Sequence, residues 1–213
     1  MKTKIHITGC VVAALFLLTL PARADLVLLA TNSGATQGDT GDTLEVGLTN
    51  NGPSDVTIGG FSFGISVPST SGITFTDVTT NTATPYIFAG TSLFGPDITN
   101  PGQTLPATDI TASDITENPS GIDVASGSTV GLGLVFFSVA ANAAPTSVSV
   151  NFDDYPVSSL SDENGNNVSI DTFEGSAILV APSTAAVPEP SAAAALAGLV
   201  LAAGTFVRHR RAC

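Results

Sequence analysis

The stretch from residue 25 to residue 187 contains no Lys, Arg, His or Cys, and the whole chain of 213 residues contains no Trp. Without His and Cys, this stretch cannot form a Ser-His-Asp or Cys-His nucleophilic site, nor supply imidazole or thiolate ligands to zinc. Without Lys and Arg, it has no Schiff-base lysine and no arginine clamp for phosphate. Only carboxylate and hydroxyl chemistry is left, and a packed core rather than disulfides must stabilise the fold.

The charges that are present are segregated along the chain. All six basic residues lie near the two ends, at positions 2, 4, 23, 208, 210 and 211. Of the 18 Asp and Glu residues, all except Glu189 lie between residues 25 and 187. A uniformly acidic stretch repels phosphate backbones, so nucleic acid is not expected as a partner.

The N-terminus has the three parts of a secretion signal. A short basic region precedes an apolar run from Val11 to Leu20, and Ala22 and Ala24 supply the small residues that a signal peptidase recognises. The apolar run is too short to span the roughly 30 Å of a bilayer core. Residues 1–24 are therefore predicted to be a signal peptide, cleaved after Ala24 during export across the inner membrane.

The C-terminus has a second targeting pattern. A Pro/Ala-rich linker at 181–190 ends in Pro188-Glu189-Pro190, and an uncharged apolar run at 191–207 precedes the basic residues of 208–213. A helix over 191–207 would be about 25 Å long, which makes it a marginal transmembrane helix suited to transient anchoring in the inner membrane. The positive-inside rule places the tail 208–213 in the cytoplasm.

This order of motif, apolar helix and terminal Arg cluster resembles the PEP-CTERM sorting signal. The resemblance covers about 25 residues at the end of the chain and implies processing by an exosortase at Pro188, Glu189 and Pro190. It also implies a Gram-negative bacterium that makes exopolysaccharide, and a final location at the cell surface or in the extracellular matrix. A plain tail anchor remains the alternative interpretation.

The middle of the chain has the alternation of β-strands. Apolar residues recur at every second position around 44–48, 61–67 and 148–152, while 130–139 is apolar on both alternations, as in a central strand covered on two sides. A last strand is expected at 177–180. Turn-forming residues at 50–53 and 162–165 separate strands, and no helical period is found before the C-terminal segment. Residues 25–180 are predicted to form one all-β domain, a β-sandwich with jelly-roll connections.

Both ends of this domain resemble cohesin-like sandwiches. Residues 41–46 before 58–63 are similar to the opening strands of that fold, and 133–139, 148–152 and 175–180 to its last strands. The resemblance implies the fold but not the dockerin partner, because the binding residues of the family cannot be matched one by one. Residues 85–125 resemble no part of it.

One segment has the spacing of a calcium loop. Asp162, Asn164 and Asn166 stand at positions 1, 3 and 5 of such a loop, which makes them weak candidates for a cation site. Asn167 stands where the loop needs Gly, and Phe173 where it needs the bidentate acid. A simple hairpin turn is the competing interpretation, and these mismatches favour it.

Catalysis is not expected. Asp153 and Asp154, together with Glu163, Asp171 or Glu174, could supply the carboxylate pair of a glycoside hydrolase. No Trp is available to stack on a sugar, however, and the acids are spread as on a solvated surface.

A Thr-rich segment lies at 73–84, with Thr at 74, 76, 79, 80, 82 and 84. A hydroxyl array for ice or polysaccharide would need a register repeated along many strands, which the sequence lacks. An exposed Thr-rich strand is the ordinary interpretation.

The sequence thus predicts a non-enzymatic, exported protein of the cell surface or the biofilm matrix. Its uncompensated carboxylates would bind acidic exopolysaccharide through divalent cations. The alternative is a β-sandwich module that binds a carbohydrate or a protein directly. No cofactor is predicted apart from the weak calcium candidate.

Overall fold

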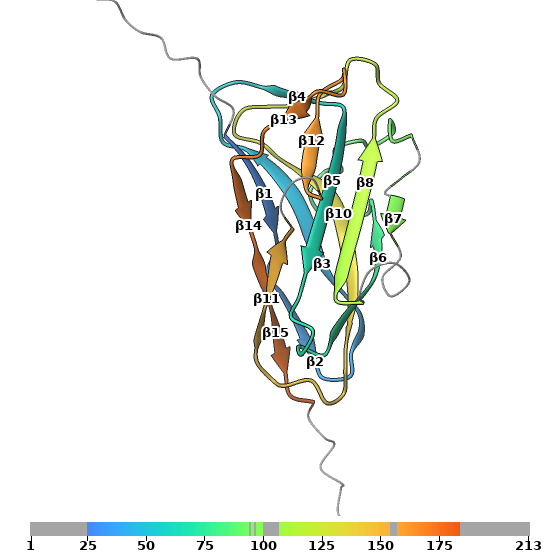
Figure 1. The fold of residues 1–213 in the computed structure, drawn as a ribbon, viewed down its shortest axis with the longest axis vertical. Coiled ribbons are helices and arrows are strands. Elements are labelled where there is room, and N and C mark those ends of the chain that lie inside the picture. The colour runs from blue at the N-terminus through green and yellow to red at the C-terminus, as the bar shows by residue number, and fades with distance from the viewer. Residues whose placement is uncertain (1–24, 94, 96, 100–106, 154–156, 184–213) are drawn as a thin grey trace, which may run out of the picture.

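The computed structural model describes residues 25–93, 95, 97–99, 107–153 and 157–183 of the chain (Figure 1). The predicted signal peptide with Ala22 and Ala24, the sorting motif 188–190, the helix 191–207 and the tail 208–213 lie outside these residues, as does Asp154. All regular structure in the described part is β-strand, which confirms the all-β prediction. This part of the chain has no helix that could cross a membrane.

The described residues form fifteen strands. In chain order they are β1 (Leu26–Ala30), β2 (Ser33–Thr36), β3 (Thr40–Asn50), β4 (Val56–Ile58), β5 (Gly60–Ser66), β6 (Ile73–Thr79), β7 (Asp97–Thr99), β8 (Asp109–Ile115), β9 (Ile122–Val124), β10 (Thr129–Val139), β11 (Ser147–Phe152), β12 (Ser159–Ser161), β13 (Asn167–Val168), β14 (Thr172–Glu174) and β15 (Ser176–Ala181).

Two sheets pack face to face as a sandwich. The first has five strands in the order β14-β1-β3-β10-β6. The second has eight, with the order β13-β12-β5-β11-β15-β2 and with β8 paired to β5 and β7 paired to β8. In Figure 1, β5 and β8 of the second sheet lie in front of β3 and β10 of the first. A small ribbon of β4 and β9 adds to one end.

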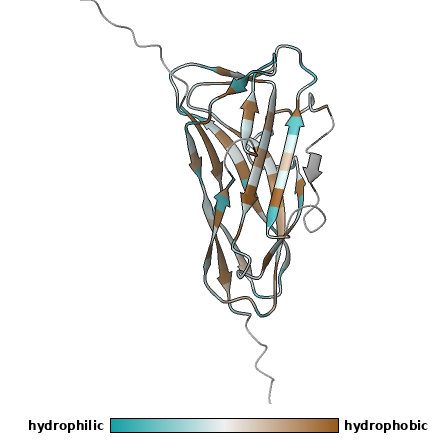
Figure 2. Cartoon of the chain, viewed as in Figure 1, coloured by the Kyte–Doolittle hydropathy of each residue, from teal (hydrophilic) through white to brown (hydrophobic). Residues whose placement is uncertain are grey.

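The core lies between the two inner faces. Its largest fully buried side chains include Phe63 from the second sheet and Phe75 and Phe137 from the first. Apolar and polar residues alternate along most strands, as the changing colours of Figure 2 show, so each strand contributes every second side chain to the core. Each such burial stabilises the fold by about 1.5–3 kcal/mol.

The strands expected around 44–48, 61–67, 130–139, 148–152 and 177–180 are all present. Two details differ from the prediction. Glu45, expected on a polar face, is only 8% exposed, because its carboxylate oxygens accept hydrogen bonds from the backbone N–H groups of Ala83 (2.9 Å) and Thr84 (3.1 Å). Strand β10 is central, but its outward side chains Leu134 and Phe136 are only half-buried, because the first sheet is partly open to solvent there.

The segment from Thr80 to Leu93 closes one side of the sandwich. It leaves β6, forms a bridge from Tyr86 to Gly131 of β10, and reaches β8, where the backbone N–H of Leu93 donates to the carbonyl of Ile115 (3.0 Å). Phe88, fully buried, packs on Phe61 with 5.6 Å between ring centroids. The aromatic side chain of Phe88 thus fills the space at this side of the sandwich, between the two sheets.

The long axis of the sandwich has two distinct ends. The β12–β13 turn and the end of β8 lie at one end, at the top of Figure 1. The last strand, β15, runs to the opposite end.

Candidate binding face

Strand β5 lies between β12 on one edge and β8 on the other. Its inward positions carry the core side chains Phe61, Phe63 and Ile65, so the alternate positions point outward. These outward residues are all small: Gly60, Ser62, Gly64 and Ser66. Around Gly60 and Ser62 the middle strand therefore presents a nearly flat surface, whereas the side chain of Val157 packs over Gly64.

The neighbouring strands continue this surface. The register places Ser159 of β12 and Ser113 of β8 on either side of Ser62, and the next row ends on Ile115 of β8. We call eight of these outward residues the Ser/Gly face: Gly60, Ser62, Gly64, Thr111, Ser113, Ile115, Ser159 and Ser161. Ser66 and Asp109 lie beyond it, at the other end of β5 and β8. Except for Ile115, the face has only small side chains.

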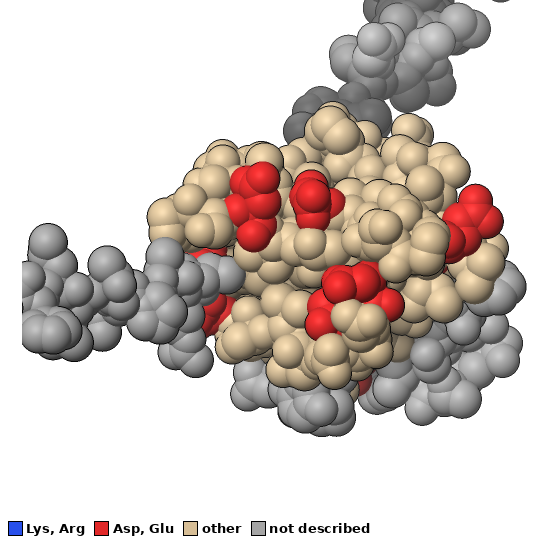
Figure 3. All heavy atoms as spheres, turned by 90° about the horizontal axis from the view of Figure 1, so that it is seen from above, with Lys and Arg blue, Asp and Glu red and all other residues tan. Residues whose placement is uncertain are grey.

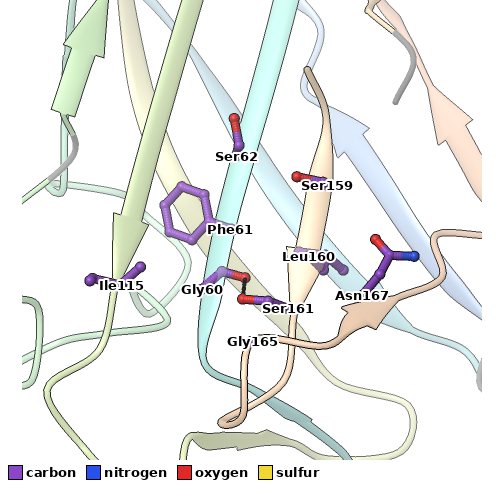
Figure 4. A pocket seen from close by; sticks show the side chains of 9 residues that line it. All are labelled: Gly60, Phe61, Ser62, Ile115, Ser159, Leu160, Ser161, Gly165 and Asn167. Carbon is purple, nitrogen blue, oxygen red and sulfur yellow. Dashed lines mark hydrogen bonds between the residues drawn. The ribbon is translucent and has the colours of Figure 1, made fainter. Parts of the chain in front are cut away.

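Two adjoining hollows mark the upper end of the Ser/Gly face. The first, about 280 Å³, is lined by strands β5, β8, β12 and β13, with the side chain of Ile115 on one side and Asn167 on the other (Figure 4). The second, about 240 Å³, lies between the β8–β9 loop and the β12–β13 turn and includes Asp162 and Glu163. Because both are lined by Ile115, Ser161 and Gly165, we treat them as one groove.

The floor of this groove is rigid. The backbone N–H of Gly59 donates to the carbonyl of Ser161 (2.7 Å), and the carbonyl of Gly59 accepts from the N–H of Thr116 (3.0 Å). A Cβ on Gly59 would overlap the backbone carbonyl of Asp162, so only Gly lets the turn pack this closely. The groove is thus preformed in the fold.

A buried carboxylate lies beneath the groove. Asp114, only 4% exposed, accepts hydrogen bonds at Oδ2 from the hydroxyls of Tyr86 and Ser92 (2.6 Å each), and at Oδ1 from the N–H of Ile115 (2.8 Å). Burial, and then the hydrogen bond to Asp114, raise the pKa of Tyr86 above its ordinary value. This network ties the segment 80–93 to the strand that carries Ile115.

The calcium candidates all lie in the β12–β13 turn. Oδ1 of Asp162 accepts from the backbone N–H groups of Asn164 (2.9 Å) and Asn166 (2.8 Å), and Oδ2 accepts from Nδ2 of Asn166 (2.9 Å). These bonds, above all the one from the Asn166 side chain, lower the pKa of Asp162. The carboxylate therefore stabilises a hairpin turn, and cation binding by these three residues stays an untested prediction.

The other carboxylates considered from the sequence lie on separate elements. Asp153 follows β11, Glu163 is in the β12–β13 turn, Asp171 precedes β14 and Glu174 ends it. Within the described residues, no three or more His, Cys, Asp or Glu side chains come together as a metal site. The acids are also not all solvated as expected, since Asp114 is buried with neutral donors around it.

The Thr-rich segment divides into a strand and a loop. Thr74 and Thr76 are exposed on β6, as an ordinary exposed strand requires, while Thr82 is half-buried against Gly131 in the segment that closes the sandwich.

Strand β8, which carries three of the eight residues of the Ser/Gly face, was not expected from the sequence. Its inward positions are Ile110, Ala112 and Asp114, all buried. The alternation of Ile110 and Ala112 with Thr111 and Ser113 was a usable signal of a strand. The acidic residue Asp114 at the next inward position obscured this alternation.

Comparisons with known proteins identify the fold. No protein-family model matches this chain, and no curated protein matches it. Among solved structures, a chain of the CaDoc0917–CaCohA2 complex matches with a TM-score of 0.56 and 17% identity, over 73% of this chain and 99% of that one. CaCohA2 is from Clostridium acetobutylicum.

Two further matches carry the word cohesin in their descriptions. A chain of the complex between the sixth cohesin of Acetivibrio cellulolyticus scaffoldin B and the Cel5 dockerin matches with a TM-score of 0.53 and 11% identity, over 74% of this chain and 99% of that one. The seventh ScaB type I cohesin of Pseudobacteroides cellulosolvens matches with a TM-score of 0.51 and 14% identity, over 77% and 96%. At these identities the similarity concerns the backbone arrangement alone, and residues 25–183 have a cohesin-like β-sandwich fold.

Proposed function

We propose that this chain is an exported, non-enzymatic protein whose β-sandwich binds a partner protein through the Ser/Gly face and its groove. The observation that carries the proposal is the exposed Ile115, 48% accessible, which lines both hollows of a groove on a face of mostly small side chains. Flat, preformed surfaces with an exposed apolar centre suit protein docking, because little conformational entropy is lost on binding.

The solved structures of similar fold support this proposal by analogy. Three of them are described as complexes between a cohesin and a dockerin, so the sandwich is a scaffold on which a protein-binding surface has been built. Fold similarity does not transfer the partner, and we do not assign a dockerin to this chain.

The absence of suitable chemistry supports a non-enzymatic role. Asp114 and Asp162 accept hydrogen bonds from neutral donors, and Asp153, Glu163 and Asp171 lie on separate elements. Neither hollow of the groove is lined by a His, Cys, Lys or Arg side chain.

Export and sorting complete the proposal. The signal peptide 1–24 would direct the chain across the inner membrane, and Pro188-Glu189-Pro190 with the apolar run 191–207 would hold it there until an exosortase releases it to the cell surface or matrix. Intact-mass measurement of the protein from its native host, with and without the exosortase, tests this part. A C-terminus that stays unprocessed in both strains would contradict sorting.

Site-specific crosslinking in the native host tests the binding face. A photoreactive amino acid is placed at Ile115 in one variant and at Leu179 in a control; Leu179 is 61% exposed on β15 of the same sheet, toward the opposite end. We expect one defined protein to crosslink through position 115 and not through position 179. Equal crosslinking at both positions, or none at 115, would argue against the Ser/Gly face as the docking surface.

A further inference from the structure

The electrostatic character of the groove restricts what can occupy it. Asp162 and Glu163 line its upper part, and the described residues contain no Lys, Arg or His. Figure 3, which looks onto this end of the molecule, shows acidic side chains and no basic ones. Any occupant therefore meets a negative field that no cation of this domain offsets.

Glu163 is placed to meet a charged occupant. Its side chain is exposed, and its Oε1 accepts one hydrogen bond, from Nδ2 of Asn164 (2.8 Å). Asp162, in contrast, uses both oxygens within the turn. Glu163 is thus the carboxylate of the groove that can accept further hydrogen bonds from a partner at little cost in local structure.

Ile115 supplies the apolar contact. It belongs to both hollows, and its side chain is one of the few large apolar groups exposed in the described part of the chain. Ile115 and Glu163 both line the second hollow, and the first hollow continues from Ile115 over β5 to β12, so an extended segment of chain fills the whole groove better than a single small group does.

Other classes of occupant fit these features less well. A second copy of this domain would bring the same acids and no cation. An acidic polysaccharide would be repelled unless divalent cations bridged it, and the described residues form no cluster of three or more acidic groups to hold such a cation. A neutral sugar would need an aromatic face to stack on, but Phe61, the aromatic ring that lines the groove, is only 4% exposed.

We propose that the groove binds an extended, basic segment of a partner protein, with an apolar side chain packed on Ile115 and a Lys or Arg paired with Glu163. This inference rests on the proposed function and adds the chemistry of the partner. The ion pair gives specificity and a salt-dependent association, while the contact at Ile115 gives most of the affinity.

Fluorescence anisotropy with defined peptides tests the proposal on the protein purified from its native host. The probes are a short labelled peptide in which Lys and Leu alternate and its counterpart in which Glu replaces Lys. We expect the Lys/Leu peptide to bind, with an affinity that falls as salt is raised, and the Glu/Leu peptide not to bind.

Matched variants locate the binding. E163Q is expected to weaken the Lys/Leu peptide by about threefold, as for an exposed ion pair, while E174Q, an exposed Glu on β14, leaves it unchanged. I115S is expected to weaken it by about tenfold through lost apolar contact, while L179S does not.

The outcomes separate this inference from the proposed function. Equal effects of E163Q and E174Q, or equal binding of both peptides, would overturn the basic-segment proposal. If a host protein still crosslinks through position 115 in that case, protein docking on the Ser/Gly face stands and only the chemistry of the partner is wrong. If crosslinking at 115 is also absent, both proposals fail.

Discussion

Asp114 offers the sharpest test of how the segment 80–93 is held against the strand that carries Ile115. Its buried carboxylate is the common acceptor for Tyr86, Ser92 and the backbone of Ile115. Two substitutions separate shape from hydrogen bonding. D114A removes the acceptor altogether, whereas D114N keeps one oxygen for the N–H of Ile115 and an amide that can donate to the two hydroxyls.

The magnitude follows from the number of donors left without a partner. Removing one side of a buried, charge-assisted network costs about 3–5 kcal/mol, because each orphaned donor keeps its desolvation penalty. D114N keeps the acceptor for the N–H of Ile115 and lets the two hydroxyls accept from its amide, but the hydroxyl protons of Tyr86 and Ser92 lose their acceptor, so its cost is expected to be about 1–3 kcal/mol, below that of D114A. A domain of this size is stable by roughly 5–15 kcal/mol, so both variants should still fold.

Urea unfolding measures both values. The chain has no Trp and two Tyr, so tyrosine fluorescence follows the environment of Tyr86, and circular dichroism follows the sheets independently. We expect coincident transitions, with the D114A midpoint well below that of D114N. A loss below about 1 kcal/mol for D114A, or equal losses for the two variants, would refute the assignment of Asp114 as the acceptor that holds the segment.

Three further predictions concern the same end of the molecule. F88A is expected to lower the free energy of unfolding by about 3–5 kcal/mol, because the fully buried ring fills the space beside Phe61; a loss under about 1 kcal/mol in chemical denaturation would contradict this packing. G59A is expected to displace the turn at Asp162, because the added methyl group would overlap the backbone there. The displacement should appear as faster amide hydrogen exchange in residues 161–166 and as weaker binding of the Lys/Leu peptide. Unchanged exchange would contradict this close packing of the turn on Gly59. Because the pKa of Tyr86 is raised in the folded protein, the stability that its neutral form contributes is present below the ordinary value of 10.0 and is lost as the pH rises beyond it. Unfolding midpoints measured across alkaline pH should therefore fall in the wild type and less steeply in Y86F.

The sandwich could be predicted because its main strands have strong alternation. Phe61, Phe63 and Ile65 form an apolar set that only an inward-facing β5 can accommodate, and β10 is long and continuously apolar. The closing segment was not predictable in the same way. Tyr86 and Phe88 stand two positions apart, but Ile87 between them is buried as well and residues 87–90 form a turn, so no alternation marks them. Only the tertiary structure shows that they fill the side of the sandwich.

The binding face could not be predicted because its residues are what any solvated strand contains. Ser62, Ser113 and Ser159 come from three distant parts of the chain, and only the strand register brings them into one row. The sequence did indicate the β12–β13 turn, through Asp162 and its amide neighbours, and favoured a simple hairpin over a cation site, but it gave no sign of a groove. Its observed role is to form one wall of the groove.

The opposite placement of the groove and of the end of β15 sets the geometry of any attachment through the C-terminal side. A molecule held from the end of β15 stands on that end, and the whole length of the sandwich then separates the groove from the attachment point. The length of the domain itself thus acts as a spacer between the groove and the attachment point. A longer linker would let one molecule reach a wider area, and the groove would stay at the end far from the attachment point. A circular permutation that placed the attachment point beside the groove would instead turn the groove toward the supporting surface and cover it.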